Sequence, residues 1–146
     1  MRLFHKDLIP VLPRLQLLGQ WRECCCIARN IEVNGTPNHI LVNKIMDYPI
    51  DHFINYSAEV ARIMINRGYR VDFKKFTKHF NDDIINKCEN LSAYQIFNGW
   101  HNTRYLQQCF YNLQEKYDCG GISKYEYDKL KEIINFAWWN EEYVEE

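Results

Sequence analysis

The longest helical pattern in the sequence covers residues 13–35, PRLQLLGQWRECCCIARNIEVNG. Pro13 suits the first turn of a helix, where its missing amide hydrogen would have no partner, and Gly35 is a typical residue to end one. Apolar and small residues recur at helical spacing on one side of the pattern. They are Leu17, Leu18, Trp21, Cys24, Cys25, Ala28 and Ile31. We therefore expect a helix from Pro13 to Asn34 that buries this stripe.

Helical patterns account for most of the remaining chain. The predicted segments are residues 49–67, residues 73–80, residues 101–117 and a last helix that follows Ser123. Ser123 and Glu126 have the spacing of a capping box, which marks the start of that last helix. Residues 81–100 are less regular, and Asn98-Gly99 indicates a turn. With no internal repeat and no alternating strand pattern, the sequence predicts an all-α fold of about four to five helices.

Length and composition limit the architecture. With 146 residues and 47% hydrophobic content, the chain fits one compact domain with a core. We place this helical domain at residues 1–140 and expect the acidic end, residues 141–146, to fray. No run approaches the roughly 18 apolar residues that cross a membrane. The first ten residues carry Arg2, Lys6 and Asp7 without an apolar signal core, so we expect a cytoplasmic protein.

The six cysteines are expected to be reduced thiols, because disulfides are rare in the cytoplasm. Cys24, Cys25 and Cys26 are adjacent, and on a helix their side chains point about 100° apart. They therefore do not converge easily on one metal ion, and the other cysteines lack the short paired spacing of a zinc site. We expect neither a metal nor a cofactor.

The charge of the chain is unevenly distributed, although its net value is only −1. Residues 1–80 hold 12 Lys and Arg against 7 Asp and Glu, whereas residues 81–146 hold 6 against 12. Because salt limits the reach of each charged face to about 10 Å, one basic face can bind phosphates while another face is acidic. The distribution is compatible with a nucleic-acid partner but does not demonstrate one.

The outer face of the first predicted helix carries an ionisable pair, Arg22 and Glu23. In most proteins such a pair is simply solvated. Here the neighbouring Gly19 and Cys26 are both small, which leaves a shallow place where another chain could approach closely. Arg14, Arg22 and Arg29 are spaced by eight and seven residues on one side of the helix, as suits a strip of phosphate contacts.

Several short motifs stand out in the first half of the chain. They are Met1-Arg2, Gln20-Trp21-Arg22-Glu23, His39, Asn43-Lys44-Ile45 and Asn66-Arg67-Gly68-Tyr69. Together they resemble the pyrimidine-dimer DNA glycosylases of the endonuclease V type. The run from Met1 to Gly19 is similar to a bacterial branch of that family, and the second half of the chain matches only loosely.

The resemblance implies a nucleophile and a residue that assists it. In this family the terminal amine attacks the sugar carbon that bears the damaged base, and a glutamate helps. In this sequence the pair would be Met1 and Glu23. Met1 itself is the expected terminus, because the bulky Arg2 normally blocks removal of the methionine. An α-amino group has a reference pKa of about 7.7–8.0, so a useful fraction is the neutral nucleophile at physiological pH. Such chemistry needs neither a metal nor a cofactor.

The resemblance also implies the partner, which is damaged double-stranded DNA with pyrimidine dimers as the expected lesion. The implied activities are removal of the base by a glycosylase and strand cleavage at the abasic site by a lyase. The expected DNA-binding residues are Arg2, Arg14, Gln16, Arg22, Arg29 and His39. Gln16 stands where the family has a histidine, and His39 either caps its loop or faces the DNA. We expect a monomer.

The alternative is a non-catalytic helical module that binds DNA or protein and retains the fold. The two interpretations differ in one respect. An enzyme of this kind needs a free amine, so an extension before Met1 should abolish its activity. A binding module should tolerate the same extension.

Overall fold

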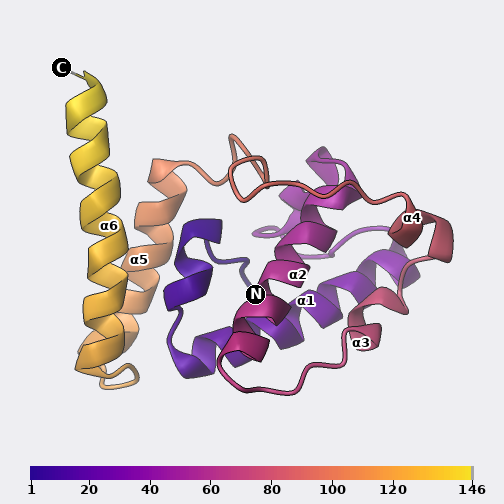
Figure 1. Cartoon of the computed structure of the whole chain (residues 1–146), viewed down its shortest axis with the longest axis horizontal. Helices are drawn as coiled ribbons and strands as arrows, with labels where there is room; N and C mark the ends of the chain where they lie inside the picture. Colours follow the sequence, from indigo (N-terminus) through magenta and orange to yellow (C-terminus); the bar gives the residue numbers. More distant parts are fainter. Residues whose placement is uncertain (146) are drawn as a thin grey trace.

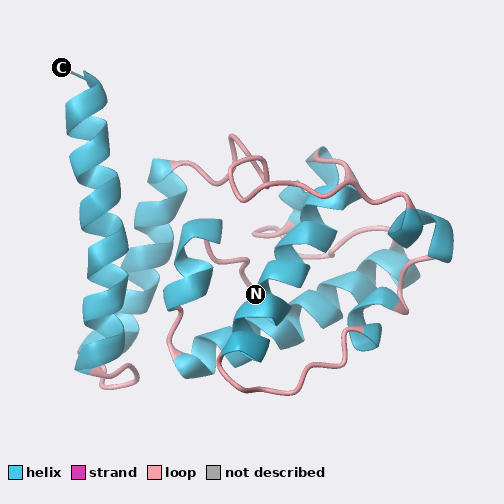
Figure 2. Ribbon diagram, in the orientation of Figure 1, coloured by secondary structure: helices cyan, strands magenta, loops and turns pink. Residues whose placement is uncertain are grey.

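The computed structural model describes the backbone of residues 1–145 and the side chains of residues 1–137. Within this range every regular element is a helix, so the predicted all-α fold is confirmed (Figure 2). The longer helices are α1 (Arg14–Asn34), α2 (Ile50–Asn66), α5 (Thr103–Asp118) and α6 (Lys124–Glu145). The shorter ones are η1 (Lys6–Val11), η2 (Asn43–Asp47), α3 (Lys74–Thr77) and α4 (Asp82–Asn86). No helix of the described chain is long and apolar enough to cross a membrane.

Helix α1 ends at Asn34, as Gly35 predicted, and it begins at Arg14, one residue after the predicted start at Pro13. Pro13 precedes it, and Gly35 ends it with a φ of 77° while its amide donates to the carbonyl of Ile31. Of the predicted inner stripe, the structure buries Leu17, Trp21, Cys24 and Ala28. It leaves Leu18, Cys25 and Ile31 only half-buried, and it buries Gln20 and Ile27 in addition. The buried face is therefore rotated toward Gln20, because the side chain of Gln20 has partners in the N-terminal segment.

The core between α1, α2 and α3 is aromatic. Phe53 of α2 and Phe76 of α3 have ring centroids 5.3 Å apart in an edge-to-face arrangement. Trp21 of α1 stacks on Phe73, just before α3, at 5.8 Å. Helix α3 is too short to be stable alone, so it depends on this burial, which contributes about 25 cal/mol per Å² of apolar surface. The same core holds α1 and α2 across each other (Figure 1).

Helices α5 and α6 form an antiparallel pair on the other side of the molecule (Figure 1). Tyr117 and Tyr127 stack between them with centroids 4.1 Å apart. The predicted capping box is confirmed, because the amide of Glu126 donates to the hydroxyl of Ser123 and the amide of Ser123 donates to the Glu126 carboxylate. Helix α6 continues to Glu145, and the domain boundary at residue 140 stays a prediction. The side chains of the predicted acidic tail lie outside the described residues.

The connection between α4 and α5 is anchored by Phe97. This residue has a φ of 50°, which is uncommon for any residue but glycine, and it is fully buried. Its ring lies 4.8 Å from that of Trp100 and 5.4 Å from that of Tyr48. The Tyr48 hydroxyl accepts from the amide of Trp100 at 3.0 Å and donates to the carbonyl of Asn98 at 2.7 Å. The predicted turn at Asn98-Gly99 thus fixes the start of α5 against the first half of the chain.

Most of the N-terminal segment after Arg2 is buried, and the first residue lies near the centre of the view in Figure 1. Leu3, Leu8 and Ile9 are fully buried. Helix η1 follows directly and packs against α2 and α6. The chain therefore starts at the surface with Met1, passes α1 at Arg2 and enters the core at Leu3.

Candidate active site

The N-terminal segment passes directly beside Glu23. The amide of Arg2 donates a hydrogen bond to Oε2 of Glu23 at 3.2 Å, although 21 positions separate the two residues in sequence. Glu23 lies near the middle of α1 and is half-buried. Met1 is the next residue toward the terminus and is 36% exposed. Met1 therefore precedes by one residue the amide that contacts the carboxylate, and it is accessible to solvent.

Gln20 binds the same segment one helical turn earlier. Its Oε1 accepts from the amide of Phe4 at 2.9 Å, and its Nε2 donates to the carbonyl of Arg2 at 3.0 Å. The side chain is only 1% exposed. Because residues three apart on a helix lie on one face, Gln20 and Glu23 hold neighbouring backbone groups of one extended segment. A buried amide that uses both of its polar atoms in this way fixes the direction of the chain.

Two buried tyrosines hold the segment from other helices. Tyr56 of α2 donates to the carbonyl of Phe4 at 2.5 Å, and Tyr105 of α5 donates to the carbonyl of Leu3. Burial raises the pKa of both hydroxyls above the usual value, so both stay protonated and donate at physiological pH. Residues 2–4 are thus bound by α1, α2 and α5 at once. We refer to Gln20, Tyr56 and Tyr105 as the N-terminal clamp.

The clamp was not predicted from the sequence. Gln20 belongs to the family motif, and it also falls between Leu17 and Cys24 on the stripe of α1 that turns inward. A polar residue at an interior position of an apolar stripe is a signal of a buried hydrogen-bonding role. The tyrosines carry no such signal, because in the sequence a tyrosine on an inward face cannot be distinguished from an ordinary core residue.

A pocket of about 520 Å³ opens next to the segment. Its lining residues are Arg2, Ile40, Leu41, Lys44, Trp100, Asn102, Arg104, Tyr105 and Gln108. Arg2, Lys44 and Arg104 bring three positive charges to it from three separate parts of the chain. Among the described residues that line it, none is acidic. Since Arg2 also contacts Glu23 through its amide, this basic pocket and the carboxylate are parts of one site.

The Arg2 side chain affects the buried groups below it. Burial raises the pKa of Tyr105 and of Cys109, and the positive charge of Arg2 opposes that rise for both. The Arg2 guanidinium therefore lies close to Tyr105, with which it lines the pocket. Of the predicted DNA-binding residues, Arg2 is the one that the structure places directly against the candidate catalytic pair.

Arg22 and Arg29 lie exposed on α1. The Arg22 side chain folds back along the helix, and its Nη2 would lie 3.8 Å from a Cβ atom added to Gly19. The guanidinium thus occupies the shallow place that the sequence predicted beside Gly19. Both arginines are free to meet a phosphate, and their DNA contacts stay predictions.

Arg14 and Gln16 lie at the other end of α1. Arg14 is nine residues before Glu23, which is about 13.5 Å along the helix axis. Its Nε donates to the hydroxyl of Tyr69 at 3.0 Å, and its amide donates to the Glu126 carboxylate at 2.7 Å. Gln16 is half-buried, and its Oε1 has no hydrogen-bond partner among the described residues. The structure therefore does not bring these two residues to Glu23, and a DNA contact by either stays a prediction.

His39 caps its own loop. Its Nδ1 accepts from the amide of Leu41 at 3.2 Å, and its amide donates to Oδ1 of Asn43 at 3.1 Å. The ring is half-exposed. The loop-capping role, one of the two predicted alternatives, is present in the structure. A contact with DNA stays a prediction.

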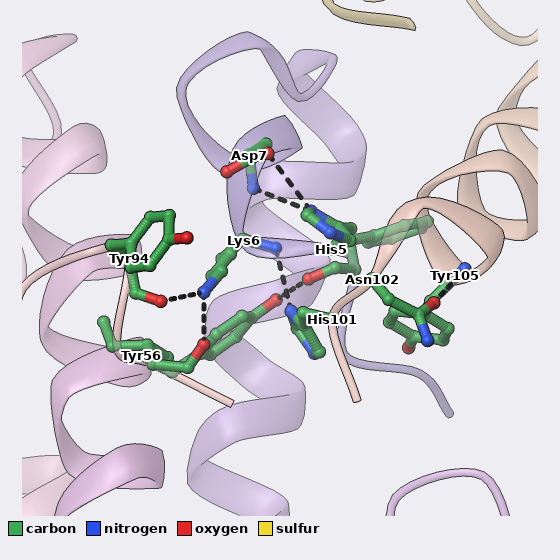
Figure 3. Close-up of polar contacts among 10 residues, drawn as sticks. His5, Lys6, Asp7, Tyr56, Tyr94, His101, Asn102 and Tyr105 are labelled. Carbon is green, nitrogen blue, oxygen red and sulfur yellow. Dashed lines mark hydrogen bonds and ion pairs between the residues drawn. The ribbon is translucent and has the colours of Figure 1, made fainter. Parts of the chain in front are cut away.

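A second polar cluster ties the N-terminal segment to the loop before α5 (Figure 3). The amide of Lys6 donates to Nδ1 of His101 at 3.0 Å, and the Lys6 ammonium donates to the carbonyls of Tyr94 and Ile96 at 2.9 and 2.6 Å. Burial lowers the pKa of His101 well below its usual value, so the ring is neutral at physiological pH. With Nδ1 accepting, Nε2 carries the proton, and it has no partner among the described residues. The cluster binds the segment to the residues that lead into α5.

Comparison with known proteins gives one match. The model of the pyrimidine dimer DNA glycosylase family covers residues 1–77. The matched part contains Met1, Arg2, Gln20, Glu23 and Tyr56, whereas the α5 side of the pocket lies beyond it. The same comparisons find no matching curated protein and no matching solved structure.

Proposed function

The chain belongs to the pyrimidine dimer DNA glycosylase family, and from this premise we propose that it removes damaged bases through the amine of Met1 and then cleaves the strand. The observation that carries the proposal is the contact between the Arg2 amide and Glu23, at 3.2 Å. This contact supports the proposal because Arg2 directly follows the residue that would carry the nucleophile. The proposed substrate is duplex DNA that contains a pyrimidine dimer.

The first step joins the protein to the sugar. The lone pair of the neutral Met1 nitrogen forms a bond to C1′ while the bond between C1′ and the base breaks. The base leaves with the electron pair of the broken bond and takes up a proton. Glu23 stabilises the positive charge that develops on the sugar, and it accepts a proton from the attacking nitrogen. Opening of the sugar ring then gives a Schiff base between the Met1 nitrogen and C1′.

The second step breaks the strand. A base removes a proton from C2′, the electron pair of that C–H bond forms a double bond between C1′ and C2′, and the positively charged Schiff-base nitrogen becomes neutral. The nitrogen lone pair then re-forms the Schiff base while a double bond forms between C2′ and C3′, and the 3′ phosphate leaves with the electron pair of the C3′–O bond. In this proposal Glu23, which accepts from the Arg2 amide, serves as the base of this step. Water finally releases the amine.

The basic residues supply the DNA contacts. Arg2, Lys44 and Arg104 line the pocket beside the clamp, and Arg22 and Arg29 lie exposed along α1. Contacts of this kind to phosphates position a duplex without reading its sequence. Although the net charge of the chain is −1, these residues form a local basic face that can bind phosphates.

Borohydride trapping tests the proposal. The substrates are duplexes that hold an abasic site or a pyrimidine dimer, and the proteins are the native chain, a chain extended before Met1, and Glu23→Gln. We expect a covalent adduct with the native terminus only, and at least a hundredfold slower trapping with Glu23→Gln. An adduct that survives the extension would assign the nucleophile to a lysine. DNA binding without any adduct would favour a non-catalytic module.

Glu32→Gln is the matched control. Glu32 is an exposed carboxylate on the same helix, nine residues after Glu23, and its Oε1 lies 3.2 Å from the His79 ring. The same loss of charge there should leave the trapping rate unchanged. An equal loss in both variants would mean that only the overall charge of α1 matters.

A further inference from the structure

The loop between α1 and η2 ends in an apolar tip. Ile40 is 85% exposed and the next residue, Leu41, is 47% exposed. A single exposed apolar residue is ordinary, but two in sequence at a loop tip form a continuous protrusion. Both also line the basic pocket beside the N-terminal clamp. The tip therefore belongs to the face that carries the candidate active site.

The tip is held rigidly by hydrogen bonds at its base. The amides of Val42 and Asn43 donate to the carbonyl of His39 at 3.0 and 2.9 Å. The ring of His39 accepts from the amide of Leu41, and the side chain of Asn43 accepts from the amide of His39. Val42 is fully buried and anchors the loop in the core. The exposure of Ile40 is thus built into a fixed turn.

The charges around the tip indicate which partner it meets. Arg2, Lys44 and Arg104 line the same pocket, and no acidic residue lies among its described lining. An apolar protein partner would leave these three cations without counter-charges. A duplex supplies phosphates for the cations and an apolar base stack for the tip.

We propose that Ile40 and Leu41 insert between stacked bases of the duplex at the lesion. Branched apolar side chains of this size act as wedges in proteins that kink DNA, because they replace the stacking contacts that a kink removes. Here the wedge would hold the stack open next to the Met1 amine, while Arg2, Lys44 and Arg104 hold the flanking phosphates. This role rests on the proposed function, since it serves access to the sugar.

The test uses the double variant Ile40→Ser, Leu41→Ser in the full chain with a native terminus. A duplex with 2-aminopurine beside a stable abasic-site analogue reports unstacking as a rise in fluorescence. We expect the native protein to raise the fluorescence at saturation and the double variant to lose most of that rise. Ile65→Ser is the control, because Ile65 is 55% exposed on α2 outside the pocket lining.

Trapping rates separate the wedge from the chemistry. On duplex DNA we expect the double variant to form the adduct at least tenfold more slowly than the native protein. On a single-stranded oligonucleotide with an abasic site, where no stack must be opened, the two should react equally fast. Restoring bulk with Ile40→Leu, Leu41→Ile should restore the duplex rate.

The outcomes are distinct. Equal fluorescence and equal duplex rates for the native protein and the double variant would overturn the wedge, while native adducts would leave the proposed chemistry intact. A fluorescence rise that depends on the tip, without any adduct, would overturn the chemistry and retain the wedge. If the tip instead controls self-association in sedimentation and leaves the fluorescence unchanged, it is a contact between copies of the chain.

Discussion

The hydroxyl of Tyr105 donates a hydrogen bond to the carbonyl of Leu3, across 102 positions of sequence. The family match ends at residue 77, so this contact ties the matched part of the chain to a helix beyond it. Tyr105 also lines the basic pocket. The second half of the protein therefore takes part in shaping the candidate site as well as completing the core.

Removing this hydroxyl should slow the chemistry more than it weakens DNA binding. Tyr105→Phe loses the hydrogen bond to Leu3 and leaves its carbonyl unpaired, which costs about 1–3 kcal/mol. Because the terminus is then held less firmly beside Glu23, we expect the single-turnover trapping rate to fall about tenfold with little change in the Kd for DNA. Tyr111→Phe, an exposed tyrosine on the same helix, should change neither quantity. A loss confined to the Kd would contradict the positioning role.

Gln20→Met should destabilise the protein. Methionine has a similar length, but it leaves the amide of Phe4 and the carbonyl of Arg2 without their partner in a buried place. We expect the free energy of unfolding to fall by about 2–4 kcal/mol in urea denaturation. Gln16→Met is the matched control on the same helix, since Oε1 of Gln16 has no partner among the described residues. Equal effects at both positions would show that the Gln20 bonds contribute nothing specific.

The buried histidines predict a loss of stability in acid. Burial lowers the pKa of His5 and of His101 in the folded protein, whereas an unfolded histidine has a pKa of about 6.5. Between the lowered values and about 6.5 the unfolded chain binds more protons, so the free energy of unfolding falls as the pH is lowered. We expect this fall below about pH 6.5 in urea denaturation at a series of pH values.

His101→Asn checks the origin of that slope. The asparagine carbonyl can still accept from the amide of Lys6, but one titrating group is gone. The free energy of unfolding of this variant should depend less steeply on pH. A slope equal to that of the native protein would mean that other groups cause the acid sensitivity.

The basic pocket predicts a salt effect on DNA binding. If Lys44 and Arg104 each neutralise one phosphate, replacing either with alanine should reduce the slope of log K against log salt by about 0.9. Fluorescence anisotropy with a damaged duplex measures the slope. Arg62→Ala removes the same charge from α2, where the guanidinium already pairs with Glu59 at 2.6 Å, and it should leave the slope unchanged. Equal slopes for the native protein and both pocket variants would exclude the pocket from the DNA interface.

The sequence predicted the features that local chemistry determines. Pro13 and Gly35 bound α1 because backbone geometry restricts both residues, and Ser123 with Glu126 opens α6 for a similar reason. Glu23 was identified as a candidate by its motif. The burial of Gln20 was not predicted, because it depends on backbone groups of residues 2–4 rather than on its own helix.

The features that the sequence did not predict depend on long-range contacts. Nothing near Lys44 or Arg104 in the sequence shows that they share a pocket with Arg2, since η2 and α5 reach it through separate connections. The reverse holds for Arg14, which fits the arginine spacing of α1 but lies about 13.5 Å along the helix axis from Glu23 and donates to the hydroxyl of Tyr69. Helical periodicity predicts which face of its helix a residue occupies. It does not predict which residues of other elements lie against that face.

The clamp also has a consequence for the order of assembly during synthesis. Residues 2–4 leave the ribosome early, yet Tyr56 is made about fifty residues later and Tyr105 about a hundred residues later. A segment whose partners lie so far along the chain cannot dock until they emerge, and such contacts form slowly. The amine that we propose as the nucleophile would thus gain its place beside Glu23 only when the chain is mostly made, so a nascent chain would carry the reactive group without the site that directs it.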